Sequence, residues 1–284
     1  MKYRHGFHAG NFADVHKHVT LLALLTALKR KEKGFLYLDT HAGRGGYDLS
    51  SPSAEAASGI GRFAPGADAA PELREYAALL ARCRSSLGRP HLYPGSPLLA
   101  LAALRAQDRA VFIETQAAEA HALADLVELC REAAAQRTRI ERGDGYARMR
   151  AWLPPPERRA LTFLDPPYEE TRQDFLAVTE ALADGLRRFG TGVFAAWYPI
   201  KDARTTSAWQ LECVRALAAP LLVSELWLYP RDARVALNGS GMLIVNPPWR
   251  ILEHMQVWLP QLLTTLTVGS AGGNSARMLR ESAP

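Results

Sequence analysis

The feature that most constrains this chain is an alternation of short apolar runs with longer helical patterns. Four of the runs end abruptly at a glycine-rich, acidic or proline-rich turn. The predicted strands cover residues 35–38, 110–114, 139–142, 161–164, 193–198, 224–229 and 241–246. Because parallel strands need crossover connections, usually helices, this order predicts an α/β fold with a mostly parallel sheet. Only a loop separates the last two strands, so we expect them to pair antiparallel at an edge of the sheet.

Helical patterns fill the segments between most of these strands. The first, at residues 12–31, has Asn11 as its predicted N-cap and Asp14 as the capping partner three residues later. Its apolar side chains recur at helical spacing, so one face should pack against a core. Ser96 is the predicted N-cap of a helix that begins at Pro97. Further helices are predicted at residues 71–87, 116–136, 174–189 and 206–218.

Composition predicts the domain boundaries. The chain has 284 residues, of which 48% are apolar, so it can bury a sizeable core. Residues 1–46 and 94–269 are predicted to form the α/β domain. Residues 47–93 are rich in serine, proline, alanine and glycine, and we expect an inserted helical subdomain there. Residues 270–284 are rich in glycine, serine and arginine, which predicts a disordered tail.

Bulk properties exclude several protein classes. No run approaches the roughly 20 apolar residues that span a bilayer, and the first five residues lack the apolar stretch of a secretory signal. We therefore expect a cytoplasmic protein with no membrane partner. The three cysteines lie far apart and are odd in number, so we expect neither a disulfide framework nor a thiolate zinc site. They are Cys83, Cys130 and Cys213.

The chain is basic, with a net charge of +5 and eleven arginines between residues 131 and 188. Lysine and arginine neutralise phosphates, so this balance favours a polyanionic partner without requiring one. Arginine suits phosphate better than lysine does because its planar guanidinium donates in a fork. A basic rim close to the functional motifs is therefore plausible.

The most informative string is Asp165-Pro166-Pro167-Tyr168, which directly follows a predicted buried strand. Two consecutive prolines end the strand's hydrogen-bond ladder and leave the Pro166 carbonyl free. A carboxylate and a carbonyl together can accept both hydrogens of an amino group, which makes the nitrogen lone pair available for attack on a methyl group. Tyr168 is predicted to offer a face on which an extruded base stacks.

A similar string, Asn246-Pro247-Pro248-Trp249, occurs later in the chain. Its position argues against the same role. Asn246 ends a strand predicted to be antiparallel, so it should face away from the crevice where open α/β sheets bind ligands. Asp165 ends a parallel strand and should face that crevice.

Three further acidic or glycine-rich segments follow successive strands. Residues 39–46 form a glycine-rich turn in which Gly43 is a candidate cofactor contact, and no Gly-Lys-Ser/Thr follows, which argues against a phosphate loop of ATP-binding proteins. Glu114 ends the next strand, where an acid commonly binds ribose hydroxyls. Asp144 lies between two glycines and could accept from an adenine amino group. This order favours an adenosyl cofactor beside an amine-methylating corner.

Five of the eight histidines fall within the first 41 residues. A metal site is the alternative interpretation, but no HExxH motif or carboxylate cluster accompanies them. We therefore expect no bound metal. Cationic or hydrogen-bonding groups near the cofactor are the preferred interpretation.

Together these motifs resemble one family along nearly the whole chain: the bacterial 23S rRNA adenine-N6 methyltransferases, formerly described as proteins for catabolism of external DNA. The resemblance rests on four strings: Tyr3-Arg4-His5-x-Phe7-His8-Ala9-Gly10-Asn11-x-Ala13-Asp14-Val15-x-Lys17-His18, Phe35-Leu36-Tyr37-Leu38-Asp39-Thr40-His41-Ala42-Gly43, Tyr93-Pro94-Gly95-Ser96-Pro97 and Asp165-Pro166-Pro167-Tyr168. The family often has Gly-Ala-Gly where this chain has Gly43-Arg44-Gly45.

The resemblance implies a Rossmann-like methyltransferase with a small helical insertion, using S-adenosyl-L-methionine on 23S rRNA, either naked or in an early assembly intermediate. It implies that Asp165 is the catalytic acid-base residue and that Tyr3 contacts the RNA. The residues that it implies in cofactor binding are His18, His41, Ser96, Glu114, Asp144 and Gly145, with Asp165 beside them. We expect the protein to act as a monomer.

Three other functions stay open at this point. A DNA adenine or cytosine methyltransferase would use the same corner, because either nucleic acid carries exocyclic amines. A non-catalytic nucleic-acid-binding protein for DNA uptake would need no cofactor. A histidine-based metallonuclease is the third.

Overall fold

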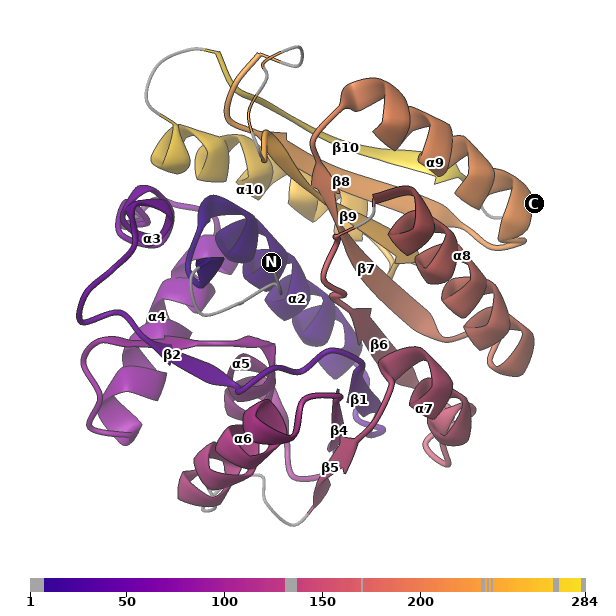
Figure 1. Cartoon of the computed structure of the whole chain (residues 1–284), viewed down its shortest axis with the longest axis horizontal. Coiled ribbons are helices and arrows are strands. Elements are labelled where there is room, and N and C mark those ends of the chain that lie inside the picture. The colour runs from indigo at the N-terminus through magenta and orange to yellow at the C-terminus, as the bar shows by residue number, and fades with distance from the viewer. Residues whose placement is uncertain are drawn as a thin grey trace.

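The computed structural model describes the whole chain except residues 1–7, 131–136, 170, 231, 232, 234, 236, 268–270 and 282–284. An eight-stranded sheet runs through the molecule (Figure 1), in the order β10-β8-β9-β7-β6-β1-β4-β5. Its strands are β1 (Leu36–Asp39), β4 (Arg109–Glu114), β5 (Thr138–Arg142), β6 (Ala160–Leu164), β7 (Val193–Ile200), β8 (Leu221–Trp227), β9 (Gly239–Val245) and β10 (Gly273–Arg280). A separate short pair joins β2 (Gly46–Asp48) to β3 (Leu92–Pro94).

The predicted α/β fold with a mostly parallel sheet is confirmed. β1 pairs parallel with both β4 and β6, and the parallel set continues to β5 on one side and β7 on the other. β9 is antiparallel to β7 and β8, as the sequence predicted for the last two strands. The edge is not formed by this pair, however, because β10 covers β8.

The prediction of a disordered tail at residues 270–284 is wrong for residues 273–280. These residues form β10, which pairs antiparallel with β8 along its length. Two arginines also anchor the strand: Arg277 donates to the Gln210 side chain and Arg280 to the Leu217 carbonyl. The polar composition of the segment suits a half-buried edge strand, so composition alone could not separate this strand from a frayed end.

Helices cover both faces of the sheet (Figure 1). One apolar core lies under α2 (Phe12–Lys29), α4 (Pro71–Ser86), α5 (Ser96–Ala103), α6 (Ala117–Leu129) and α10 (Ile251–Leu266). The other lies under α7 (Gly145–Trp152), α8 (Thr171–Arg188) and α9 (Ala203–Ala216). Within the predicted insertion, α4 packs on α2 and α5, and the short α3 (Ala54–Ser58) contacts α2. None of the described helices is both long and apolar enough to cross a membrane.

α2 is buried almost all around, which explains why its polar residues matter. It packs against β9, α4, α5 and α10. Asn11 caps it by accepting from the Asp14 amide, as predicted, while Asp14 accepts from the Gly10 amide and not from Asn11. The helix nevertheless buries Lys17 and His18. A buried polar group needs a partner, so these side chains must be satisfied by neighbouring elements.

Candidate active site

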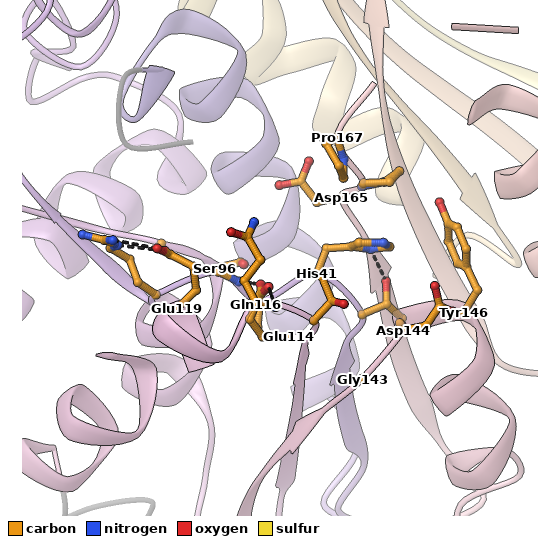
Figure 2. Close-up of a pocket in the computed structure, with 18 of the residues that line it drawn as sticks. His41, Ser96, Glu114, Gln116, Glu119, Gly143, Asp144, Tyr146, Asp165 and Pro167 are labelled. Atoms are coloured by element: carbon orange, nitrogen blue, oxygen red, sulfur yellow. Dashed lines mark hydrogen bonds and ion pairs between the residues drawn. The ribbon is translucent and has the colours of Figure 1, made fainter. Parts of the chain in front are cut away.

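A cavity of about 930 Å³ opens at the carboxyl ends of the parallel strands. The strand order reverses between β1 and β6, and ligands of open α/β sheets bind in the crevice at such a switch point. Loops after β1, β4, β5 and β6 form its walls, together with α2 and the starts of α5, α7 and α8. Figure 2 shows Asp165, His41, Asp144, Glu114 and Ser96 around this space.

The loop after β1 is held by Asp39, whose carboxylate is fully buried. It accepts hydrogen bonds from the Ser96 hydroxyl at 2.7 Å, the Tyr37 hydroxyl at 3.0 Å and the His41 amide at 3.2 Å. Burial raises the pKa of Asp39 to about 6, although these hydrogen bonds act in the opposite direction. The prediction that Ser96 is the N-cap of α5 is wrong. Gly95 is the N-cap, and the Ser96 hydroxyl donates to Asp39 instead.

Glu114 links the glycine-rich turn to the end of β4. One carboxylate oxygen accepts from the Gly43 amide at 2.8 Å and the other from the Gln116 amide at 2.7 Å. Gly43 has φ +61°, and a side chain there would also meet the Tyr47 hydroxyl. Glu114 and Gly43, both of which the sequence predicted as cofactor contacts, line the cavity.

The turn after β5 brings the Asp144 and Gly145 positions into the cavity beside His41. Asp144 caps α7 by accepting from the Ala147 amide. A Cβ on Gly145 would lie 2.0 Å from the Thr40 carbonyl oxygen, so only glycine fits where α7 meets the β1 loop. His41 packs edge-on against Tyr146, and burial lowers its pKa to about 4. His41 is therefore neutral near pH 7 and acts through hydrogen bonds or shape.

Asp165 directly follows β6 and lies beside a lysine for which the sequence predicted no role. Lys17 Nζ lies 2.5 Å from one Asp165 oxygen and 2.7 Å from an Asp14 oxygen, and its side chain is only 4% exposed. Burial opposes the charge, but the two carboxylates raise the pKa of Lys17 above its ordinary value. The buried lysine therefore stays protonated between two carboxylates. Pro166 and Pro167 line the cavity beside Asp165.

Tyr168 does not line the cavity, contrary to the expected stacking role. Its ring is 8% exposed and packs against Phe175 and Trp197. Its hydroxyl donates to the Trp197 carbonyl oxygen at 2.7 Å. Tyr168 therefore braces the corner from behind, and a base in the cavity would not meet its face.

The other predicted positions divide as follows. His18 lines the cavity, and its Nδ1 lies 2.9 Å from the Tyr93 hydroxyl. Asn246 lies outside the cavity at the end of antiparallel β9, where its side chain donates to the Gly190 and Gly192 carbonyls. Tyr3 lies outside the described residues.

The histidine-rich segment has structural partners. His16 lies within hydrogen-bond distance of the Ser224 and Ser240 hydroxyls, and His8 within that of Glu55. Burial lowers the pKa of His16 to about 3. Among the described residues, no three histidine, cysteine or acidic side chains gather in a way that could hold a metal ion.

The cavity thus has two chemical parts. The loops after β1, β4 and β5 present acceptors and backbone amides suited to a polar nucleoside-like ligand. Asp165 and Pro166 line one side of the cavity, where the Asp165 carboxylate pairs with buried Lys17. The sequence found most of both parts, but not Lys17, Tyr146 or Asp174, which also line the cavity.

Known proteins are similar to this chain, in sequence and in structure, over nearly its full length. A family described as "Ribosomal RNA large subunit methyltransferase D, RlmJ" matches residues 32–279. Ribosomal RNA large subunit methyltransferase J of Escherichia coli K12 is 37% identical over 276 residues, 96% of each chain, and the Haemophilus influenzae protein of the same name is 36% identical. The crystal structure of LPL1258 from Legionella pneumophila superposes with a TM-score of 0.83 at 32% identity, covering 95% of this chain and 98% of that one.

Proposed function

Since the chain belongs to the ribosomal RNA large subunit methyltransferase J family, we propose that it transfers a methyl group from S-adenosylmethionine to the N6 amine of an adenine in 23S rRNA. The observation that carries this proposal is the position of Asp165. It directly follows the parallel strand β6 and lines, with Pro166, the same cavity as the glycine-rich turn, Glu114 and Asp144.

The residues in the cavity fit an adenosyl cofactor. Glu114 stands at the end of β4, where its acceptor oxygens suit ribose hydroxyls. Asp144 and Gly145 suit the adenine ring, and the close contact of Gly145 with Thr40 keeps that wall free of a side chain. His18, His41 and Ser96 would contact the amino-acid portion. When bound, the cofactor supplies an electrophilic methyl group.

The chain's own residues would prepare the target amine. Asp165 and the Pro166 carbonyl would each accept one hydrogen of N6, which orients the nitrogen and withdraws its lone pair from the ring. Protonated Lys17, with Nζ 2.5 Å from an Asp165 oxygen, holds that carboxylate in place through an ion pair. As N6 gains its methyl group, the proton that it releases would pass to Asp165.

The target adenine must leave its stack to reach this corner. Extrusion costs a few kcal/mol and is cheapest for an unpaired base. Specific RNA recognition commonly uses loops and bulges for this reason. A single-stranded or loop adenine is therefore the proposed substrate.

Two variants test the catalytic assignment. Asp165→Ala should leave S-adenosylhomocysteine affinity within about threefold, because the adenosyl contacts lie elsewhere, and should lower methyl transfer by at least 100-fold. Asp165→Asn keeps the shape but removes the charge paired with Lys17, and should also lower transfer. Calorimetry gives the affinity, and tritiated methyl transfer into deproteinised 23S rRNA gives the rate. Equal loss of binding and transfer would show that Asp165 only supports the pocket.

The substrate is tested separately. Wild-type protein should label deproteinised 23S rRNA in preference to duplex DNA, and mass spectrometry of the digested RNA should find N6-methyladenosine. Preferential labelling of DNA would instead support the DNA methyltransferase. Failure to bind the cofactor at all would support the non-catalytic nucleic-acid-binding protein.

A further inference from the structure

Four cations stand at the carboxyl edge of the sheet, the edge at which the cavity opens. Arg148 lies in the first turn of α7, Arg172 in that of α8 and Arg204 in that of α9, while Lys201 directly follows β7. All four residues are exposed, and none forms a salt bridge with another described residue. Arg204 interacts electrostatically with Asp202, but all four residues are exposed, so an external anion can reach them.

The topology explains why these residues share one edge. β5, β6 and β7 belong to the parallel set, so α7, α8 and α9 all begin where their strands end. The same first turns supply Tyr146 and Asp174 to the cavity wall. Arg148 also folds back toward the cavity, because its Nε would be 2.8 Å from a Cβ built on Gly143.

The opposite end of α8 shows a different use of arginine. Arg187 and Arg188 both pair with Asp184, and Arg150 from the last turn of α7 joins the same carboxylate. At the carboxyl edge the carboxylate close to Lys201 and Arg204 is Asp202, which caps α9 by accepting from the amide and hydroxyl of Thr205. Intramolecular pairs thus occupy Arg150, Arg187 and Arg188 at this end.

An exposed aromatic residue lies at the same edge of the sheet as these cations. Tyr229 is 47% exposed and follows β8, which runs in the same direction as β7 because both are antiparallel to β9. Asn238 joins its loop to the end of β7: the Asn238 amide donates to the Ile200 carbonyl, and the Asn238 side chain accepts from the Tyr229 amide. Tyr229 therefore stands beyond Lys201 on the same edge.

We infer that this edge is the track of the substrate RNA strand: Arg148, Arg172, Lys201 and Arg204 bind phosphates flanking the target adenine, and Tyr229 stacks on a neighbouring unpaired base. The inference rests on the proposed function. From β5 to β8 the track crosses six strand spacings, about 29 Å. Cations following the backbone, together with an aromatic face for bases, are the means by which proteins bind single-stranded nucleic acid.

A matched pair of variants tests the phosphate contacts. Arg172→Gln with Arg204→Gln removes charge at the starts of α8 and α9, and Arg188→Gln with Arg215→Gln removes the same charge at the ends of the same helices. Affinity for deproteinised 23S rRNA is measured at several salt concentrations. The first pair should flatten the slope of log affinity against log salt by about 1.4, because each phosphate contact to a single strand contributes about 0.7. The second pair should keep the wild-type slope.

Tyr229→Ala tests the stacking contact independently. It should weaken RNA binding by about 5- to 160-fold, the range for one base stacked on an aromatic ring, and should leave the salt slope unchanged. Tyr229→Phe should bind as wild type does. All variants should keep the wild-type affinity for S-adenosylhomocysteine, which shows that the cavity is intact.

Two results would overturn the track: equal salt slopes in the two arginine pairs, or unchanged RNA affinity in Tyr229→Ala. A different result would contradict the proposed function. If wild-type protein neither binds S-adenosylhomocysteine nor methylates RNA, while the two arginine pairs still differ in salt slope, the surface binds RNA but the enzyme assignment is wrong.

Discussion

At the residue scale, the decisive arrangement is one buried lysine between two carboxylates. Removing one partner of a buried ion pair costs about 3–5 kcal/mol, because the remaining charges lose their compensation. Lys17→Met should therefore lower the free energy of unfolding by about this amount, and should slow methyl transfer because Asp165 loses its counter-charge. Urea denaturation and the transfer assay measure the two effects.

A second substitution makes this prediction specific. Asp14→Asn added to Lys17→Met removes one of the uncompensated carboxylates and should restore part of the stability. It should not restore methyl transfer, because Asp165 still lacks its lysine. Wild-type stability of Lys17→Met, or no coupling between the two substitutions, would contradict the assigned ion pairs.

Asp39 predicts a pH dependence of stability. Its pKa is about 6 in the folded protein, mainly because of burial, and near 3.8 in the unfolded chain. Between these values the folded state binds more protons, so the contribution of Asp39 to stability is present at low pH and is lost as pH rises through 6. The wild-type free energy of unfolding minus that of Asp39→Asn should fall by up to about 3 kcal/mol from pH 4 to 7. A difference that stays constant across this range would refute the raised pKa.

Local sequence predicted where the acidic and glycine residues of the site lie, but it did not predict which residues from other elements contact them. Glu114 ends β4 and Asp165 directly follows β6, so local sequence was enough to place them. The link between Lys17 and Asp165 joins positions 148 residues apart, and no local pattern encodes it. The stacking face predicted at Tyr168 could not be judged from local sequence for a related reason. Its ring is buried by Trp197 and Phe175, which come from other elements.

At the element scale, β10 offers the clearest test. Deleting residues 271–284 should expose the edge of β8, remove the bonds of Arg277 and Arg280, and lower stability by 2 kcal/mol or more. Deleting only residues 282–284 is the control and should have little effect. Thermal unfolding compares the two truncations. Equal stability of both would mean that β10 contributes nothing and that the segment behaves as a tail.

The elements that sequence reasoning missed share physical causes. α7 begins at Gly145, and a glycine between polar residues indicates a turn when only the local sequence is considered. α10 contains Pro260 and follows two other prolines, so it lacks the usual helix signal, yet its apolar face is buried. β2 and β3 are three residues each, too short for a detectable alternation. Strands at 36–39, 109–114 and 160–164 were predictable because each is a continuous apolar run that ends at a turn.

At the scale of the whole molecule, strand direction separates the two similar proline corners. Asn246 and Asp165 have nearly the same local sequence, but they follow strands of opposite direction. β6 is parallel to β7, whereas β9 is antiparallel to β7. Only Asp165 therefore reaches the cavity. The direction was predictable from the sequence, because the connection between β8 and β9 is short and its described residues contain no helix.

The cavity joins four strand ends to the helices α2, α5, α7 and α8, so ligand binding should stabilise the entire domain. At 100 times its dissociation constant, a ligand that binds only the folded state adds about 2.7 kcal/mol. For a domain of this size that corresponds to roughly 5–10 °C in melting temperature. S-adenosylhomocysteine should produce this shift in both wild type and Asp165→Ala, measured by scanning calorimetry. ATP should produce none, because the turn after β1 lacks a phosphate-binding loop, and an equal shift with ATP would identify a general nucleotide site instead of an adenosyl pocket.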